Sequence, residues 1–275
     1  MLEIAGLTVG IGGTEILRGV DLSLEAGRIQ GLAGESGSGK TMTGLAVMGL
    51  LPSGSRVTGS ITYGDLELVG LSARRRNALR GTAMAMVFQD PSTSLHPMLS
   101  VSAQLTDHLH HHLGLSRGAA RDRAVELLDT VRIPDPAGAL RRYPHQFSGG
   151  QRQRIAIAIA LACSPRILIA DEPTTALDVT VQAGVLHLLR NLASEMGLAV
   201  LLVTHDLAVV GQVAGRVAVM RSGRIVETGP VRDVLLDPRH DYTRSLLAAV
   251  PTLRTDRDRP LAMIGADTAP REPQP

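Results

Sequence analysis

The chain of 275 residues is long enough to bury a large core, and its 44% apolar and 20% charged residues are typical of a globular protein. Aromatic residues make up only 2% and the formal net charge is +2, which argues against a base-stacking or polyanion-binding surface and hence against nucleic-acid binding. The single cysteine, Cys163, excludes an internal disulfide and an iron–sulfur cluster built by this chain alone.

The first part of the chain predicts antiparallel strands followed by a strand-to-helix turn. Short alternating runs at residues 7–9 and 20–24 are separated by glycine-containing turns, and residues 60–68 continue this pattern. Residues 29–33 form a short apolar run, and residues 41–51 are compatible with a helix. The segment between these two lies where a buried strand would hand over to a helix.

That segment reads G-x-x-x-x-G-K-T, which predicts a phosphate-binding loop. It consists of Gly34, Glu35, Ser36, Gly37, Ser38, Gly39, Lys40 and Thr41. Glycines allow successive backbone N–H groups to point at phosphate oxygens, and we expect Lys40 to reach the terminal phosphates and Thr41 to offer a hydroxyl to magnesium. Lys40 is the only lysine among the 28 lysine and arginine residues, which indicates a position where a planar guanidinium would not fit.

Helical segments are expected in the middle of the chain. Residues 72–80 are rich in arginine, and we interpret them as a solvent-exposed helix face rather than a nucleic-acid patch. Residues 101–140 predict a separate helical lobe. His108 and His112 lie one helical turn apart there and could in principle bind a metal, but no acidic or cysteine partner has the required spacing, so we prefer an exposed helix.

Polar side chains follow three predicted strands at the point where each strand ends. Residues 83–88 lead to Gln89, residues 167–170 lead to Asp171 and Glu172, and residues 199–203 lead to His205. In open parallel sheets this carboxyl edge is where ligands bind. We therefore expect Thr41 and Asp171 to hold magnesium, Glu172 to polarise the attacking water, and Gln89 and His205 to complete the site around the terminal phosphate.

We also expect burial at the strand end to favour Glu172 as an effective base.

A second anion site is predicted at residues 147–151, which read F-S-G-G-Q. Ser148 is a helix-capping residue, and Gly149, Gly150 and Gln151 begin a helix whose free N–H groups suit an anion. A chain with one phosphate loop and a separate anion-binding helix start invites a dimer in which each nucleotide is closed in by the partner's Ser148 motif.

These motifs together resemble the ATP-binding subunit of an ABC transporter. The phosphate loop, Gln89, the F-S-G-G-Q signature, the acidic strand at 167–172, A-L-D at 176–178 and His205 occur in family order. The resemblance implies an α/β fold over residues 1–250: a P-loop NTPase core of mainly parallel sheet, an antiparallel β subdomain and an inserted α-helical lobe at about 91–160. It also implies two subunits that sandwich two ATP molecules, with Gln89 joining the Mg²⁺ ligands.

A finer resemblance points to the oligopeptide, dipeptide and nickel importer branch. The matching stretches are F-Q-D-P at 88–91, Y-P-H at 143–145, A-D-E-P-T-T-A-L-D-V-T-V-Q at 170–182 and P-R-H-D-Y-T-R-S-L-L at 238–247. The branch implies two transmembrane permease subunits docked near the glutamine loop, a second ABC ATPase in a heterodimer or homodimer, and an extracytoplasmic solute-binding protein. The expected location is the cytoplasmic face of the inner membrane.

The sequence differs from the family at three points, and several alternative functions remain. Ile11 stands where an aromatic residue usually stacks on adenine, and Asp241 stands where the branch usually has proline; the cysteine cluster of some relatives is absent. We expect residues 251–275, with five prolines, to be a disordered tail.

The alternatives to a peptide importer are import of nickel or another small solute, an exporter subunit, and a soluble ABC ATPase acting on ribosomes or DNA.

Overall fold

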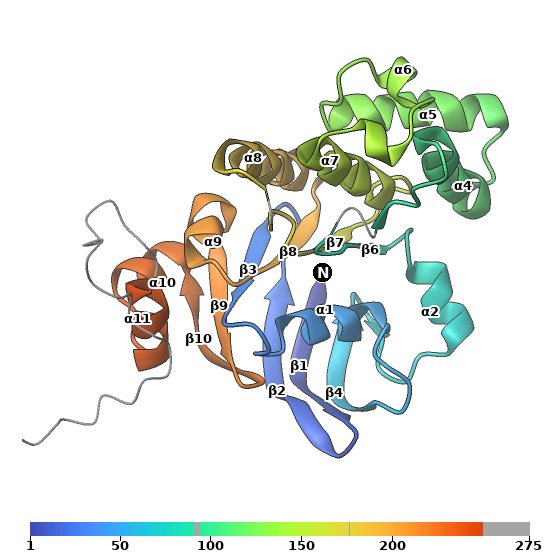
Figure 1. The fold of residues 1–275 in the computed structure, drawn as a ribbon. Helices are drawn as coiled ribbons and strands as arrows, with labels where there is room; N and C mark the ends of the chain where they lie inside the picture. The colour runs from blue at the N-terminus through green and yellow to red at the C-terminus, as the bar shows by residue number, and fades with distance from the viewer. Residues whose placement is uncertain (91–93, 176, 250–275) are drawn as a thin grey trace, which may run out of the picture.

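The computed structural model describes residues 1–90, 94–175 and 177–249, which form two sheets and surrounding helices (Figure 1). The larger sheet has six strands in the order β10-β9-β3-β8-β7-β6. Its strands are β3 (Ile29–Ala33), β6 (Met84–Val87), β7 (Ile167–Asp171), β8 (Ala199–Thr204), β9 (Arg216–Arg221) and β10 (Arg224–Pro230). All neighbours pair in parallel except β10 and β9, so the expectation of a mainly parallel core sheet is confirmed.

The smaller sheet is antiparallel and has the order β2-β1-β4-β5. Its strands are β1 (Leu2–Ile11), β2 (Thr14–Leu24), β4 (Arg56–Tyr63) and β5 (Leu66–Glu67). Buried and exposed residues largely alternate along β2, as expected for a sheet with one face on the core. The antiparallel runs predicted from the first 68 residues are therefore confirmed, with longer strands than the sequence pattern indicated.

The parallel strands are buried on both faces, which explains their uninterrupted apolar sequences. Every residue of β3, β7 and β8 is buried. One face, with Leu168 and Ala170, packs with the helical lobe in one hydrophobic cluster. The other face, with Ile167 and Ile169, packs with β1, β2 and the first helix in a second cluster. The sheet is thus a fixed central layer, and the polar residues at its carboxyl edge are held by rigid strands.

The predicted helical lobe lies above β6 and β7 in the view of Figure 1. It contains α4 (Val101–Leu113), α5 (Arg117–Thr130), α6 (Pro136–Ala139), the 3-10 turn η1 (Pro144–Gln146) and α7 (Gly149–Ala160). Ser100 and Ser116 cap α4 and α5 through their side-chain oxygens, which satisfies N–H groups at both helix starts. Buried leucines such as Leu105, Leu109 and Leu128 fix the lobe to the core.

The remaining helices connect the strands. They are α1 (Lys40–Met48), α2 (Ala73–Leu79), α8 (Val179–Met196), α9 (Leu207–Val213), α10 (Val231–Leu236) and α11 (Asp241–Ala248). Helix α2 has no buried residue, in agreement with the solvent-exposed arginine face expected there. Within the described ranges, no helix is both long and apolar enough to span a membrane. The tail predicted for residues 251–275 lies outside the described residues.

Candidate active site

The phosphate loop joins the end of β3 to the start of α1, as the sequence predicts. Two of its positions admit only glycine. A Cβ on Gly34 would lie 2.1 Å from the carbonyl oxygen of Met220, and Gly39 has a φ of 109° with a Cβ position 2.8 Å from the Leu17 side chain. The tight packing of this loop against β9 and β2 therefore holds its backbone in a defined curve.

Lys40 is the cation at the centre of this loop. Its side chain is buried, and Nζ donates to the carbonyl oxygens of Gly34 and Glu35, each at 2.8 Å. Burial lowers the pKa of Lys40, while the nearby carboxylates of Glu172, Asp171 and Glu35 act to raise it. An ammonium group folded onto two neutral carbonyls, without a direct ion pair among the described residues, can turn toward phosphate oxygens.

Two further features of the loop suit a phosphate. The hydroxyl of Ser38 is buried and has no hydrogen-bond partner within the described residues. The first turn of α1 contains no acidic residue, so no side chain of the helix itself opposes an anion at its positive end. A bound phosphate oxygen would satisfy both features.

Asp171 ends β7 directly beside the start of α1. The Thr41 hydroxyl donates to Asp171 Oδ1 at 3.2 Å, so two of the three predicted Mg²⁺ ligands lie together. Burial raises the pKa of Asp171, and the charge of Glu172 adds to this effect; the Thr41 hydrogen bond and Lys40 oppose it. A carboxylate whose charge is disfavoured by burial is stabilised when a cation binds next to it.

Glu172 has an unusual backbone and three side-chain neighbours. Its φ of 45° is in the left-handed region, and its N–H donates to Val203 O at 2.8 Å, which fixes the turn after β7. Thr175 Oγ1 donates to Glu172 Oε2 at 2.8 Å, and Gln89 Nε2 donates to the same oxygen at 3.3 Å. His205 Nδ1 lies 3.0 Å from Oε1. Gln89, Glu172 and His205, predicted separately, are thus brought together.

One expectation about Glu172 is wrong. Burial is the largest single effect and acts to raise its pKa, but hydrogen bonds from His205 and Thr175 and the charges of His205 and Lys40 together outweigh it and leave the pKa below its usual value. Glu172 is therefore ionised at neutral pH, and its strength as a base comes from position rather than from raised basicity. Its side chain is 12% exposed against 52% for His205, so solvent reaches the carboxylate beside the histidine.

Thr175 was not identified as a site residue by the sequence analysis. It follows Glu172 by three residues in a short loop, and a hydroxyl at that spacing is the signal that would have indicated a partner for the carboxylate.

The signature segment forms the N-terminus of α7, as predicted. Ser148 Oγ accepts a hydrogen bond from Gln151 N at 3.3 Å, and Gln151 Oε1 accepts one from Ser148 N at 3.0 Å, which completes a capping box. Ser148 is exposed, and a Cβ on Gly150 would lie 2.2 Å from the Val181 side chain. Across the described ranges, no hydrogen bond or ion pair connects Ser148–Gln151 to the phosphate loop.

Two further expected residues, Ile11 and Asp178, make other contacts, and a third lies outside the described ranges. Ile11 ends β1, where it is half-buried and packs against the second hydrophobic cluster. Asp178 caps α8 by accepting from Val181 N at 3.0 Å, whereas Ala176 is not among the described residues. The described part of the chain holds no group of three or more potential metal-binding side chains.

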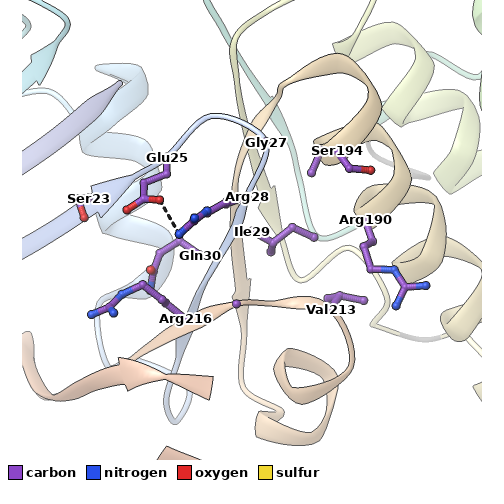
Figure 2. Close-up of a pocket in the computed structure, with 12 residues that line it drawn as sticks. Ser23, Glu25, Gly27, Arg28, Ile29, Gln30, Arg190, Ser194, Val213 and Arg216 are labelled. Atoms are coloured by element: carbon purple, nitrogen blue, oxygen red, sulfur yellow. Dashed lines mark ion pairs between the residues drawn. The ribbon is translucent and has the colours of Figure 1, made fainter. Parts of the chain in front are cut away.

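A separate hollow of about 290 Å³ lies at the opposite end of β3 (Figure 2). Ile29, at the start of the strand, lines it together with Arg190 and Arg216, and Arg28 forms an ion pair of 2.8 Å with Glu25 at its edge. The phosphate loop follows the other end of β3, so this hollow is distinct from the candidate active site.

Comparisons with known proteins agree with the chemistry of this site. The family model described as ABC transporter matches residues 17–175. The oligopeptide transport ATP-binding protein OppD of Bacillus subtilis is 46% identical over 96% of this chain and 75% of its own length. The dipeptide transport ATP-binding protein DppD of the same organism is 48% identical over 92% of this chain and 76% of its own. A dimeric ATP-binding cassette in a post-hydrolysis state with ADP and Pi matches with a TM-score of 0.72 and 29% identity, covering 84% of this chain and 99% of that one.

Proposed function

Because this chain belongs to the ABC transporter family, we propose that the ATP it binds and hydrolyses drives a membrane permease that imports peptides. The observation that carries the mechanism is the separation of two half-sites on one chain. The phosphate loop faces Asp171, Glu172 and His205, whereas the exposed N-terminus of α7 begins at Ser148 elsewhere on the surface. Two copies arranged head to tail would join each loop to the other copy's Ser148.

In this proposal the loop and its neighbours hold the nucleotide. Lys40 turns from the carbonyls of Gly34 and Glu35 to the terminal phosphates, and the backbone amides at the start of α1 bind the phosphate oxygens. Ile11 provides an apolar contact for adenine in place of an aromatic ring, which predicts a weaker contact with the base.

The oxygen atoms of Thr41 and Asp171 fit Mg²⁺, which binds to one or two carboxylates together with substrate phosphates and water. Gln89 is the third proposed ligand: its amide nitrogen donates to Glu172, which turns its amide oxygen away from that carboxylate. When bound, the ion would neutralise charge that develops on the phosphates. The raised pKa of Asp171, caused mainly by burial, agrees with a carboxylate placed to meet a cation.

Glu172 is the proposed base for hydrolysis. Its carboxylate is ionised, partly exposed and fixed on both oxygens, so it can accept a proton from a water aligned with the terminal phosphate. His205 and Gln89 hold this carboxylate in place, one on each oxygen. Catalysis in this scheme depends on position and charge rather than on a covalent intermediate.

The transport assignment extends the ATPase activity to partners. The names of the relatives support peptide as cargo. We also propose that residues 1–250 form one ATP-binding domain, with the helical lobe inserted at about 91–160. We further propose two transmembrane permease subunits, a second ABC ATPase and an extracytoplasmic solute-binding protein as partners. This places the chain at the cytoplasmic face of the inner membrane, attached through the permease.

The experiment that tests the transport assignment is affinity capture of the tagged chain from detergent-solubilised membranes of its native host, with mass spectrometry of every co-purifying protein. We expect two permeases, a sister ATPase and a binding protein, whose bound ligand identifies the cargo. Ribosomal or DNA-repair partners without a membrane protein would contradict transport while leaving the ATPase intact. A binding protein that carries a nickel chelate would contradict peptide as cargo.

A further inference from the structure

We propose that Tyr242 is a positioning residue for the phosphate loop, through which the C-terminal helix α11 sets the affinity of the site for ATP. The Glu35 N–H donates to the phenolic oxygen of Tyr242 at 3.0 Å, across 207 residues of sequence. Helix α11 lies beside α10 in Figure 1. Tyr242 is the residue of α11 that connects this helix to the phosphate loop. The inference rests on ATP binding by the loop and is independent of the cargo.

The hydrogen bond to Tyr242 comes from Glu35, whose peptide group helps to shape the first turn of the loop. Glu35 is the second residue of the motif, and its carbonyl oxygen accepts from Lys40 Nζ at 2.8 Å and from Ser38 N at 3.2 Å. When Lys40 turns toward phosphate, it releases this carbonyl. The hydrogen bonds from Glu35 N–H to Tyr242 and from Ser38 N to Glu35 then remain to keep the first turn of the loop in its curve.

Tyr242 is itself held firmly, as a positioning residue must be. Its side chain is only 3% exposed and belongs to the main hydrophobic cluster. The guanidinium of Arg221, at the end of β9, lies 4.8 Å from the centre of its ring. The turn after β9 also binds the loop directly, because Gly223 N donates to Ser38 O at 2.8 Å. The loop is therefore held by two separate hydrogen bonds, one from the turn after β9 and one to α11.

The start of α11 has its own anchor on β10. Glu227 accepts from the N–H groups of Arg239 at 2.8 Å and His240 at 3.1 Å, and the His240 side chain accepts from Tyr242 N at 3.1 Å. A chain of contacts thus leads from Glu227 through the helix start to the phenol and the loop. A shift in the position of α11 on β10 would therefore change how well the loop is preorganised for phosphate.

The test uses the purified full chain with Tyr242→Phe, which keeps the ring and removes the hydroxyl. We expect the Kd and KM for ATP to rise about three- to tenfold, the size of one lost hydrogen bond, with kcat within about twofold of the parent. The Kd is measured by titrating the purified chain with ATP in a calorimeter, and the melting temperature of each variant is recorded alongside.

A matched control and a second variant complete the experiment. Tyr63→Phe makes the same chemical change in the antiparallel sheet and should leave the Kd unchanged. Glu227→Ala, which touches neither loop nor nucleotide, should raise the Kd in the same direction as Tyr242→Phe. A Kd in Tyr242→Phe equal to that of the parent, even with a lower melting temperature, would reduce Tyr242 to a packing residue and overturn the proposal. An unchanged Kd in Glu227→Ala would overturn the claim that the anchoring of α11 by Glu227 influences the affinity for ATP.

Discussion

Replacing Glu172 by glutamine should separate ATP binding from ATP hydrolysis. The two side chains have almost the same size, and an amide oxygen at the Oε2 position can still accept from Thr175 and Gln89. The amide nitrogen would then face His205, so the geometry of the cluster is largely kept. What is lost is the negative charge and the proton acceptor. Loss of a positioned base typically costs a factor of about 100 or more, which corresponds to about 2.7 kcal/mol in the barrier.

The assay is steady-state phosphate release by the full chain, alongside ATP binding and size-exclusion chromatography with ATP. We expect hydrolysis by Glu172→Gln to fall at least about 100-fold, the Kd for ATP to stay within about threefold, and an ATP-bound dimer to accumulate. Glu195→Gln makes the same change on the exposed side of α8 and should leave hydrolysis unchanged. Hydrolysis by Glu172→Gln at the parental rate would refute the assignment of the base.

Four further variants test other parts of the site. Ser148→Arg should abolish turnover while the Kd for ATP of the single chain stays unchanged, because the clash arises only with a partner's nucleotide. Lys40→Arg should lose ATP binding in a titration, since the buried position fits an ammonium. Gly34→Ala should destabilise the protein by about 1–3 kcal/mol in urea unfolding, because its Cβ would overlap Met220 O. Thr175→Val should move the acid limb of kcat/KM to higher pH: losing this donor raises the pKa of Glu172, which acts as the carboxylate.

The phosphate loop and the capped signature helix could be predicted because their geometry is local. Gly34 and Gly39 are needed where a strand turns into a helix, and Ser148 and Gln151 satisfy each other within one turn. The sequence also allowed us to predict that Gln89, Glu172 and His205 lie close together, because parallel strands place their carboxyl ends at one edge of the sheet.

The remaining features depend on contacts that no local pattern encodes. Tyr242 reaches Glu35 only after β9, β10 and α11 have packed, and nothing in its own neighbourhood points to the loop. The expectation that burial favours Glu172 as a base was wrong for a related reason. The burial of a strand end can be predicted from an apolar sequence. The hydrogen bonds from Thr175 and His205 and the nearby positive charges, which together outweigh burial, depend on positions that the tertiary fold sets.

Asp171 and Glu172 are adjacent in sequence but differ in environment, and this difference assigns their roles. Asp171 is the buried end of β7, where desolvation raises its pKa and the Thr41 hydroxyl is its neighbour. The left-handed backbone of Glu172 turns its own side chain toward Gln89, Thr175 and His205. The hydrogen bonds from His205 and Thr175 and the charges of His205 and Lys40 together lower the pKa of Glu172 against the effect of burial. One carboxylate is thus placed where a cation would relieve its burial, and the other stays ionised beside solvent. Adjacent carboxylates separated in this way can serve one nucleotide as metal ligand and base without competing for the same proton.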